Sequence, residues 1–191
     1  MSTESQRRQL RQRRRAISPA AQQRAATAVA EQLQQQRWFA AAHRVALYSA
    51  SDGEVATQPL YNGCQRRGSD CLLPIIAPHH QLLWALWQPD AILTTNRYGI
   101  LEPPAPWQML ALTACQVVVV PLVGFDRDGN RIGMGGGYYD RALGALASSN
   151  RPITVGIAHS CQEVAKITPQ KWDIPLDYIV TERELLCAKQ K

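Results

Sequence analysis

The stretch "CQVVVVPLVGF", residues 115–125, is a near-continuous run of β-branched and other apolar side chains. Such a run is typical of a strand that is covered on both faces, as strands in parallel sheets are. A strand exposed on one face would alternate apolar and polar residues instead. The run therefore predicts a central strand with helices on either side, which is the architecture of α/β proteins.

Shorter apolar runs alternate with helical patterns along the rest of the chain. We expect strands at 44–49, 71–76, 81–87, 152–159 and 177–182, helices at 19–39, 57–68 and 137–148, and a helical arm up to Ala16. Ser18 and Pro19 form a favourable helix start, and 88–106, rich in Pro, Thr and Asn, should be mostly loop. The alternation predicts a single α/β domain over 1–191, with an open, mostly parallel sheet flanked by helices and a basic N-terminal helical arm at 1–16.

The composition argues against several classes of protein. The longest apolar stretch, 115–125, is far short of the roughly 20 residues that cross a bilayer, and the basic N-terminus lacks the apolar segment of a secretory signal. We therefore expect a cytoplasmic protein with no membrane partner. The five cysteines form no CxxC pair and their number is odd, which argues against a zinc site or a disulfide framework and predicts buried, reduced thiols.

Basic residues are concentrated in the N-terminal arm. The chain has a net charge of +6, much of it in "RRQLRQRRR" at 7–15. A basic arm suggests an anionic partner, such as nucleic acid, a phosphate or a polycarboxylate, although a solvated helix face explains the same pattern. The arm has no interleaved aromatic residues and the chain has no recognisable nucleic-acid-binding motif, so nucleic acid is the weaker alternative.

The stretch "GNRIGMGGGYYDR", residues 129–141, follows the strongest strand and precedes an expected helix. Ligands of open α/β sheets bind at the carboxyl ends of strands, and free N–H groups at a helix start suit phosphate, so the position fits a phosphate site. The patterns G-x-x-x-x-G-K-[ST] and G-x-G-x-x-G both fail here, and a tight turn that needs positive φ is the alternative. Asp140 is suited either to capping its helix or to holding Mg²⁺ beside a phosphate, and the two tyrosines either to core packing or to a wall for an aromatic ligand.

The longer stretch "PLVGFDRDGNRIGMGGGYYDR", residues 121–141, resembles the hallmark motif of the 5-formyltetrahydrofolate cyclo-ligase (methenyltetrahydrofolate synthetase) family. The stretches "LYSASDGEVATQPL", "NRYGILEPP", "VGIAHSCQ" and "KWDIPLDYIVTE" follow the order and spacing of this family, so the resemblance covers nearly the whole chain. It implies an open α/β sheet and the ATP- and Mg²⁺-dependent conversion of 5-formyltetrahydrofolate to 5,10-methenyltetrahydrofolate. In this reaction the formyl oxygen takes the γ-phosphoryl group and ADP is left. Nitrogen 10 then attacks the activated carbon and phosphate leaves, so the protein mainly aligns two ligands and neutralises charge.

The resemblance also implies roles for individual residues. It assigns ATP to the arm and the glycine cluster, at Arg7, Arg8, Arg131, Gly133, Met134, Gly135, Gly136, Gly137, Tyr138 and Tyr139. It assigns the folate to Ser49, Glu54, Tyr98, Met134, Gly135, Gly136, Gly137 and Tyr138, Mg²⁺ to Asp140 and Asp173, and catalysis to Arg131, Tyr139 and Asp140. Glu54 suits a pterin, because a carboxylate accepts two hydrogen bonds from amino and ring N–H groups.

Two positions depart from the family pattern. Some members carry lysine at the positions of Thr3 and Gly136, and we expect Arg8, Arg11 or Arg131 to supply the missing charge.

Other interpretations stay open at this point. Taken alone, Asp173 reads as a cap for a turn before Pro175, and Glu54 reads as an exposed loop acid. The rival functions are a sugar-phosphate or acyl-CoA enzyme on a similar α/β sheet, which would not need ATP, and a basic nucleic-acid-binding module, whose binding would weaken with salt. We expect a monomer that binds a small-molecule folate and no nucleic acid.

Overall fold

A seven-stranded, mostly parallel sheet forms the centre of the molecule. The computed structural model describes residues 3–188. The strand order is β11-β10-β9-β6-β1-β2-β3, with bounds Leu185–Cys187, Tyr178–Val180, Ile153–Ile157, Val117–Pro121, Arg44–Ala46, Asp70–Ala77 and Gln81–Leu86 respectively. Neighbouring strands from β10 to β2 run parallel, whereas the edge strands β3 and β11 are antiparallel to their neighbours. The prediction of an open, mostly parallel α/β sheet is confirmed.

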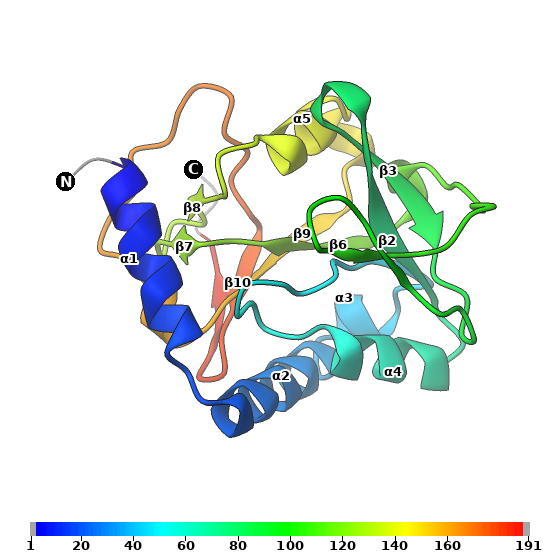
Figure 1. Ribbon diagram of the computed structural model, residues 1–191, viewed down its shortest axis with the longest axis horizontal. Coiled ribbons are helices and arrows are strands. Elements are labelled where there is room, and N and C mark those ends of the chain that lie inside the picture. The colour runs from blue at the N-terminus through cyan, green and yellow to red at the C-terminus, as the bar shows by residue number, and fades with distance from the viewer. Residues whose placement is uncertain (1–2, 189–191) are drawn as a thin grey trace.

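Helices cover both faces of this sheet (Figure 1). Three of them, α2 (Pro19–Gln34), α3 (Arg37–Ala40) and α4 (Gln58–Arg66), lie on one face, and α5 (Tyr138–Gly144) lies on the other. The basic helix α1 (Thr3–Arg15) stands beside the end of the sheet.

Strand β6 is buried between these two helical layers. Val117 and Val119 pack in the cluster that contains side chains of α2 and α4, whereas Val118 and Val120 pack in the cluster that contains Leu143 of α5. All four valines are fully buried. The run of valines is therefore explained as predicted, by burial on both faces.

The chain leaves the main sheet earlier than the apolar run suggested. β6 ends at Pro121, and the separate two-stranded sheet of β7 (Gly124–Phe125) and β8 (Arg131–Ile132) follows. The carbonyls of Leu122 and Val123 accept hydrogen bonds from the Gln162 side chain, at 2.9 and 3.0 Å, in place of a neighbouring strand. This departure directs the chain toward the glycine cluster.

The N-terminal helices agree with the sequence patterns apart from one break. Ser18 caps α2 as predicted, and its Oγ accepts a hydrogen bond from the Ala21 N–H at 3.4 Å. The helix expected to reach Phe39 is interrupted, because Gln36 has extended backbone and a second short helix, α3, follows it. α4 is closed as predicted near Gly68, which has a φ of +72°.

Several short elements were not predicted. Strand β11 pairs with β10 after the last expected strand, and β4 (Thr94–Thr95) pairs with β5 (Leu101–Glu102) inside the expected loop. Single turns of 3₁₀ helix occur at Pro78–His80, Leu112–Ala114, Ser148–Asn150 and Ser160–Gln162. α5 is shorter than the helix expected at 137–148, and it ends at Gly144.

Two further expectations concern the whole chain. In the part of the chain that the structure describes, no helix is both long and apolar enough to cross a membrane.

Cys64, Cys71 and Cys115 are buried free thiols, as expected, but the expectation of burial is wrong for Cys187, which is exposed, and for Cys161, which is half-buried. These two lie on short C-terminal elements near the surface. The assignment of 1–191 to one domain stays a prediction.

Candidate active site

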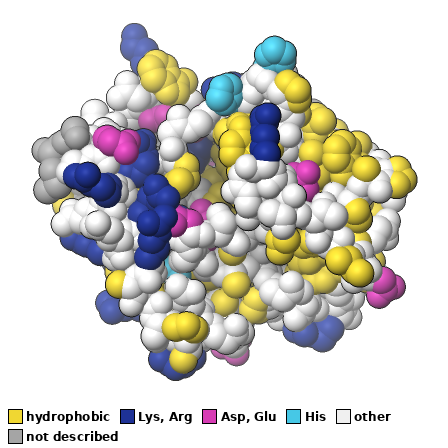
Figure 2. All heavy atoms as spheres, viewed as in Figure 1, with side chains coloured by type: hydrophobic (Ala, Val, Ile, Leu, Met, Phe, Trp, Pro, Cys, Tyr) yellow, Lys and Arg dark blue, Asp and Glu magenta, His cyan; other side chains and the backbone are white. Residues whose placement is uncertain are grey.

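A cavity of about 620 Å³ lies where the chain leaves β1 and β6 and meets the glycine cluster. On the face shown in Figure 2, basic side chains gather on the side of α1, acidic side chains lie beside them, and hydrophobic side chains spread over the opposite side. Most of the residues predicted for the site line this cavity, namely Ser49, Glu54, Tyr98, Arg131, Gly133, Met134, Gly136, Gly137, Tyr138, Tyr139 and Asp140. Arg11, Arg14 and Asp52 also line it.

The glycine loop, residues 133–137, joins β8 to α5. Gly135 and Gly137 have φ values of +95° and +63°, in the left-handed region that glycine adopts without strain. The turn with positive φ that the sequence allowed is therefore present. A Cβ on Gly135 would lie 3.6 Å from the guanidinium carbon of Arg7, and a Cβ on Gly133 would have no neighbouring atom within 4 Å. The loop thus presents bare backbone beside an arginine.

An ion pair joins the two ends of the glycine loop, and hydrogen bonds connect it to Ile174 in the segment that follows β9. Arg131 is almost fully buried, and its guanidinium lies 2.7 Å from Oδ1 of Asp140. The same guanidinium donates a hydrogen bond to the Ile174 carbonyl, and the Ile174 N–H donates to Oδ1 of Asp140 at 3.1 Å. Among the described residues, the Asp140 carboxylate accepts two hydrogen bonds, and both are at Oδ1. Asp140 is thus held in the cavity wall by a partner of opposite charge.

Asp173, the second expected metal ligand, has a different local role. Its Oδ2 accepts a hydrogen bond from the Gln170 N–H at 2.8 Å, and its own N–H donates to the Gln170 carbonyl at 3.1 Å. This is the turn cap that the sequence offered as the alternative. Asp173 does not line the cavity, although its neighbour Ile174 contacts Asp140. Among the described residues, no cluster of three or more His, Cys, Asp or Glu side chains could hold a metal ion.

The two arginines expected to contact ATP are placed differently. Arg7 reaches the glycine loop, and its Nε donates a hydrogen bond to the Gly133 carbonyl at 2.8 Å. Arg8 is exposed and does not line the cavity. The structure therefore brings Arg7, but not Arg8, to the glycine loop.

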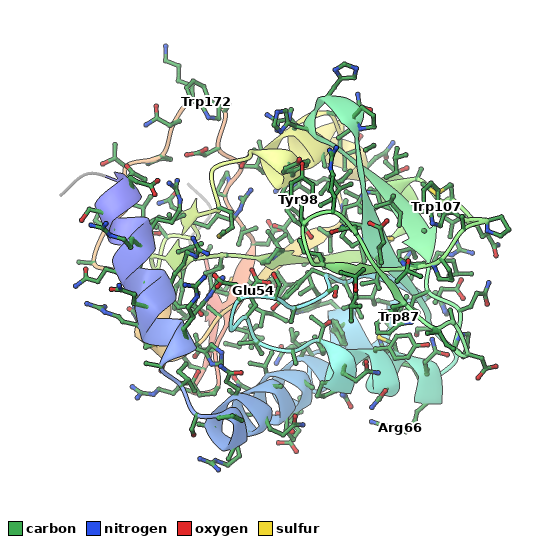
Figure 3. All side chains as sticks on the ribbon, viewed as in Figure 1. Glu54, Arg66, Trp87, Tyr98, Trp107 and Trp172 are labelled. Carbon is green, nitrogen blue, oxygen red and sulfur yellow. The ribbon has the colours of Figure 1, made fainter. Side chains whose placement is uncertain are left out.

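Glu54 lies near the middle of the molecule, beside α1 (Figure 3). Its side chain is 11% exposed, so the alternative of an exposed loop acid is wrong. Oε2 accepts a hydrogen bond from the Ser51 N–H at 3.0 Å, and Oε1 lies 3.7 Å from the Arg14 guanidinium. Burial raises the pKa of Glu54, while the Ser51 N–H and Arg14 act in the opposite direction. The carboxylate is therefore desolvated but lies beside a positive charge.

An aromatic wall forms on the side of the cavity away from α1. Tyr98, on the turn between β4 and β5, is exposed, and the interaction of its hydroxyl with that of Tyr138 lowers the pKa of Tyr98 and raises that of Tyr138. The ring of His80 lies 5.3 Å from that of Tyr138. The sequence left two roles for the tyrosines, core packing and the wall of a binding site. For Tyr138 the wall of a binding site fits better.

Comparison with known proteins identifies the family. A model of the 5-formyltetrahydrofolate cyclo-ligase family matches residues 1–182. The chain belongs to this family. It is 39% identical to the 5-formyltetrahydrofolate cyclo-ligase of Escherichia coli (strain K12), over 90% of this chain and 96% of that protein. It is also 38% identical to the Haemophilus influenzae cyclo-ligase, over 71% of this chain and 73% of that protein.

A solved structure agrees with this identification. The NMR structure of Aquifex aeolicus 5,10-methenyltetrahydrofolate synthetase superimposes with a TM-score of 0.86 and 28% identity, covering 100% of this chain and 95% of that one. The cyclo-ligase fold therefore extends over the whole sheet and its helices.

In this cyclo-ligase, a cluster of arginines that the sequence analysis missed lies beside Glu54. Arg11, Arg14 and Arg15 of α1 all form ion pairs with Asp52, at 2.7 Å for Arg11 and 2.8 Å for Arg14. Burial alone would raise the pKa of Asp52, but the hydrogen bonds from these arginines outweigh it and lower the pKa to about 2. Spacings of three and four residues along a helix were the signal that these arginines share one face.

Two buried polar groups of the cyclo-ligase have no hydrogen-bond partner among the described residues near the site. They are the hydroxyl of Tyr139, which lines the cavity, and Nε2 of His159. Burial raises the pKa of Tyr139 and lowers that of His159. Burial thus favours the uncharged form of both groups, and an orphaned hydroxyl in a cavity wall is one that a ligand or a water molecule can satisfy.

Proposed function

We infer that this protein converts 5-formyltetrahydrofolate to 5,10-methenyltetrahydrofolate by closing a carbon–nitrogen bond. The observation that carries this conclusion is the 39% identity with the Escherichia coli cyclo-ligase over nearly the full length of both chains. The match of the family model over 1–182 supports the same activity.

We propose that the folate lies in the cavity with its pterin against Glu54. The pterin has N–H donors, and Glu54 offers a largely buried carboxylate within a cavity that also contains Ser49. Tyr98 and Tyr138 would flank the aromatic part of the substrate on the opposite side. Residues of the glycine loop line the same cavity, so the two substrates would meet there.

ATP is proposed to bind with its phosphates on the glycine loop. Gly133 and Gly135 present backbone that no side chain of their own covers, and the Arg7 guanidinium lies against this loop. Bare N–H groups and a guanidinium are the usual recognition elements of phosphate. The charge of the family lysines that are missing at Thr3 and Gly136 would come from Arg11 or Arg131, which line the cavity, because Arg8 lies away from it.

Mg²⁺ is proposed to bind at Asp140. A carboxylate in the cavity wall whose described hydrogen bonds are both at Oδ1 fits a hard cation that prefers oxygen ligands. When bound, the ion would neutralise charge on the phosphates. Asp173 remains the second proposed acid, but its hydrogen bond with Gln170 makes it the weaker assignment.

In this reaction the protein mainly aligns two substrates and neutralises charge. The formyl oxygen bonds to the γ-phosphorus as the bond to ADP breaks, and nitrogen 10 then bonds to the formyl carbon as phosphate leaves. Arg131, buried beside the glycine loop, would stabilise the charge that develops on the phosphoryl group, and Tyr139 offers a neutral hydroxyl in the same wall. The catalytic assignments of Arg131, Tyr139 and Asp140 rest on this placement.

Phosphate release from ATP tests this function. With purified protein, Mg²⁺ and ATP, we expect phosphate to appear only after 5-formyltetrahydrofolate is added, in amounts equal to the folate consumed. A sugar-phosphate or acyl-CoA enzyme would release none under these conditions. Release that does not depend on the folate would contradict the proposal.

From the sequence we also propose that the protein acts in the cytoplasm as a monomer and without nucleic acid. The inward ion pairs of Arg11, Arg14 and Arg15 support the last point, because they leave fewer arm charges for a phosphate backbone. Light scattering at micromolar and higher protein concentration measures the molar mass and so tests whether the protein is a monomer.

A further inference from the structure

Helix α1 contacts both sides of the cavity. Near its start, Arg7 donates a hydrogen bond to the Gly133 carbonyl in the glycine loop. Near its end, Arg14 donates to Asp52 in the loop that carries Glu54. Leu10, between them, is buried in a cluster with Val123 and Ile132. The helix is therefore anchored in the core and touches the proposed ATP and folate regions at once.

Arg14 is the most deeply buried charge in this arrangement. Its side chain is 0% exposed. Nε and one terminal nitrogen donate to the carbonyl and to Oδ2 of Asp52, both at 2.8 Å, and the other nitrogen donates to the Leu122 carbonyl at 3.1 Å. A buried guanidinium is costly unless it is paired and hydrogen-bonded, and here it is both. Arg14 thereby joins α1, the end of β6 and the loop after β1.

The loop held by Arg14 has an unusual backbone. Asp52 has a φ of +53°, which is uncommon for a residue other than glycine. Gly53 follows with a φ of +77°, and a Cβ there would lie 3.3 Å from the Arg14 carbonyl oxygen. The loop is therefore pressed against the backbone of α1, and the arginine hydrogen bonds fix the conformation from which Glu54 projects.

We propose that Arg14 is a positioning residue for Glu54, which orients its carboxylate toward the pterin and keeps it ionised in a buried site. The proposal rests on the assignment of the folate to this cavity. It gives a chemical role to a residue of the basic arm that is separate from phosphate binding.

The charges around Glu54 support this role. Arg14 and Arg11 approach from α1 and Asp52 from its own loop, while the neutral hydroxyls of Tyr48, after β1, and Tyr139, on α5, complete the surroundings. Burial raises the pKa of Glu54, and Arg14 lowers it. Loss of the Arg14 charge should therefore raise that pKa further. Because folate binding needs the ionised carboxylate, binding would then be lost at higher pH as the solution is acidified.

The test measures the Kd for 5-formyltetrahydrofolate, without ATP, across about pH 5 to 8. We expect Arg14→Gln, which keeps hydrogen-bond donors but no charge, to raise the Kd about tenfold or more at neutral pH. It should also shift the acid limb of the binding curve, the pH range in which binding weakens on acidification, to higher pH. Arg14→Lys keeps the charge and should leave the acid limb where the wild type has it, which also serves if Arg14→Gln does not fold. The exposed neighbour Arg13 is the matched control, and Arg13→Gln should superimpose on the wild type.

A double-mutant cycle separates this role from a merely structural one. In the Glu54→Gln background, where no carboxylate remains to be charged, Arg14→Gln should add little further loss and no shift of the acid limb. Curves for Arg14→Gln that run parallel to the wild type at every pH, or an equal effect in the Glu54→Gln background, would overturn this inference alone. If the wild type does not bind 5-formyltetrahydrofolate, the proposed function and this inference both fail.

Discussion

Replacing Asp52 by asparagine removes the acceptor shared by the arginines of α1, and its effect on stability is calculable. Asparagine has nearly the same shape and tolerates the positive φ of this position, so the backbone should be kept. In the native protein the pKa of Asp52 falls from 3.8 to about 2. One pKa unit corresponds to about 1.4 kcal/mol, so the shift corresponds to about 2 kcal/mol of folding free energy at neutral pH.

The pH dependence distinguishes this ion-pair cluster from other causes of instability. A carboxylate whose pKa is lowered by folding stabilises the protein above its unfolded pKa, and the stabilisation is lost as pH falls through its folded pKa. The difference between wild type and Asp52→Asn should therefore be constant near neutral pH and shrink between about pH 4 and 2.

Urea unfolding monitored at several pH values measures this difference. Asp70 provides the matched control, because it pairs with Arg44 at 3.1 Å but is 46% exposed, and Asp70→Asn should cost less than about 1 kcal/mol. An Asp52→Asn variant as stable as the wild type at neutral pH, or a deficit that does not change with pH, would refute the reasoning.

Three further predictions concern the proposed ATP side of the cavity. Arg7→Ala should raise the KM for ATP more than that for the folate, whereas Arg13→Ala, at an exposed position, should change neither. If the two variants have the same effect, the arm attracts anions only by its overall charge. Gly135→Ala should clearly weaken ATP binding in a titration while its melting temperature falls little, because the added methyl group meets a backbone with a φ of +95° at the proposed phosphate site. Lower stability with normal ATP affinity would make the loop only a turn. Asp140→Asn should stay folded by circular dichroism but lose Mg²⁺-dependent turnover about 100-fold, and near-normal activity at limiting Mg²⁺ would remove Asp140 from the site.

The central part of the fold could be predicted because single features of the sequence determine it. The valines of β6 are apolar at successive positions only because helices cover both faces of that strand. A turn with positive φ was one of two interpretations of the glycine loop, and the position of the loop after the central strand predicted a phosphate site where the cavity lies. The residues of the family motif from Arg131 to Asp140 consequently fall in or beside one cavity wall, although their catalytic roles stay predictions.

The short strands were beyond the reach of local sequence patterns. β4, β5 and β11 contain two or three residues each, and such pairs are held by their partners rather than by their own periodicity. The break between α2 and α3 is similar, because no glycine or proline marks Gln36.

The arginine cluster was missed for a different reason. In the sequence, the basic residues of 7–15 look equivalent, and only the docking of α1 separates the buried Arg14 from the exposed Arg8 and Arg13. Their acceptor, Asp52, lies 38 residues after Arg14, between the strand expected at 44–49 and the helix expected at 57–68. Long-range ion pairs of this kind depend on tertiary packing, which composition and spacing do not reveal.

Formation of the methenyl product tests the central claim most directly. Ring closure creates a conjugated chromophore that 5-formyltetrahydrofolate lacks, so absorbance of the purified protein with substrate, ATP and Mg²⁺ reports the reaction itself. We predict that absorbance rises only when all three are present and that the rise is lost in Glu54→Gln at low folate concentration. No absorbance change in the complete mixture, with protein that is folded by circular dichroism, would contradict the assignment.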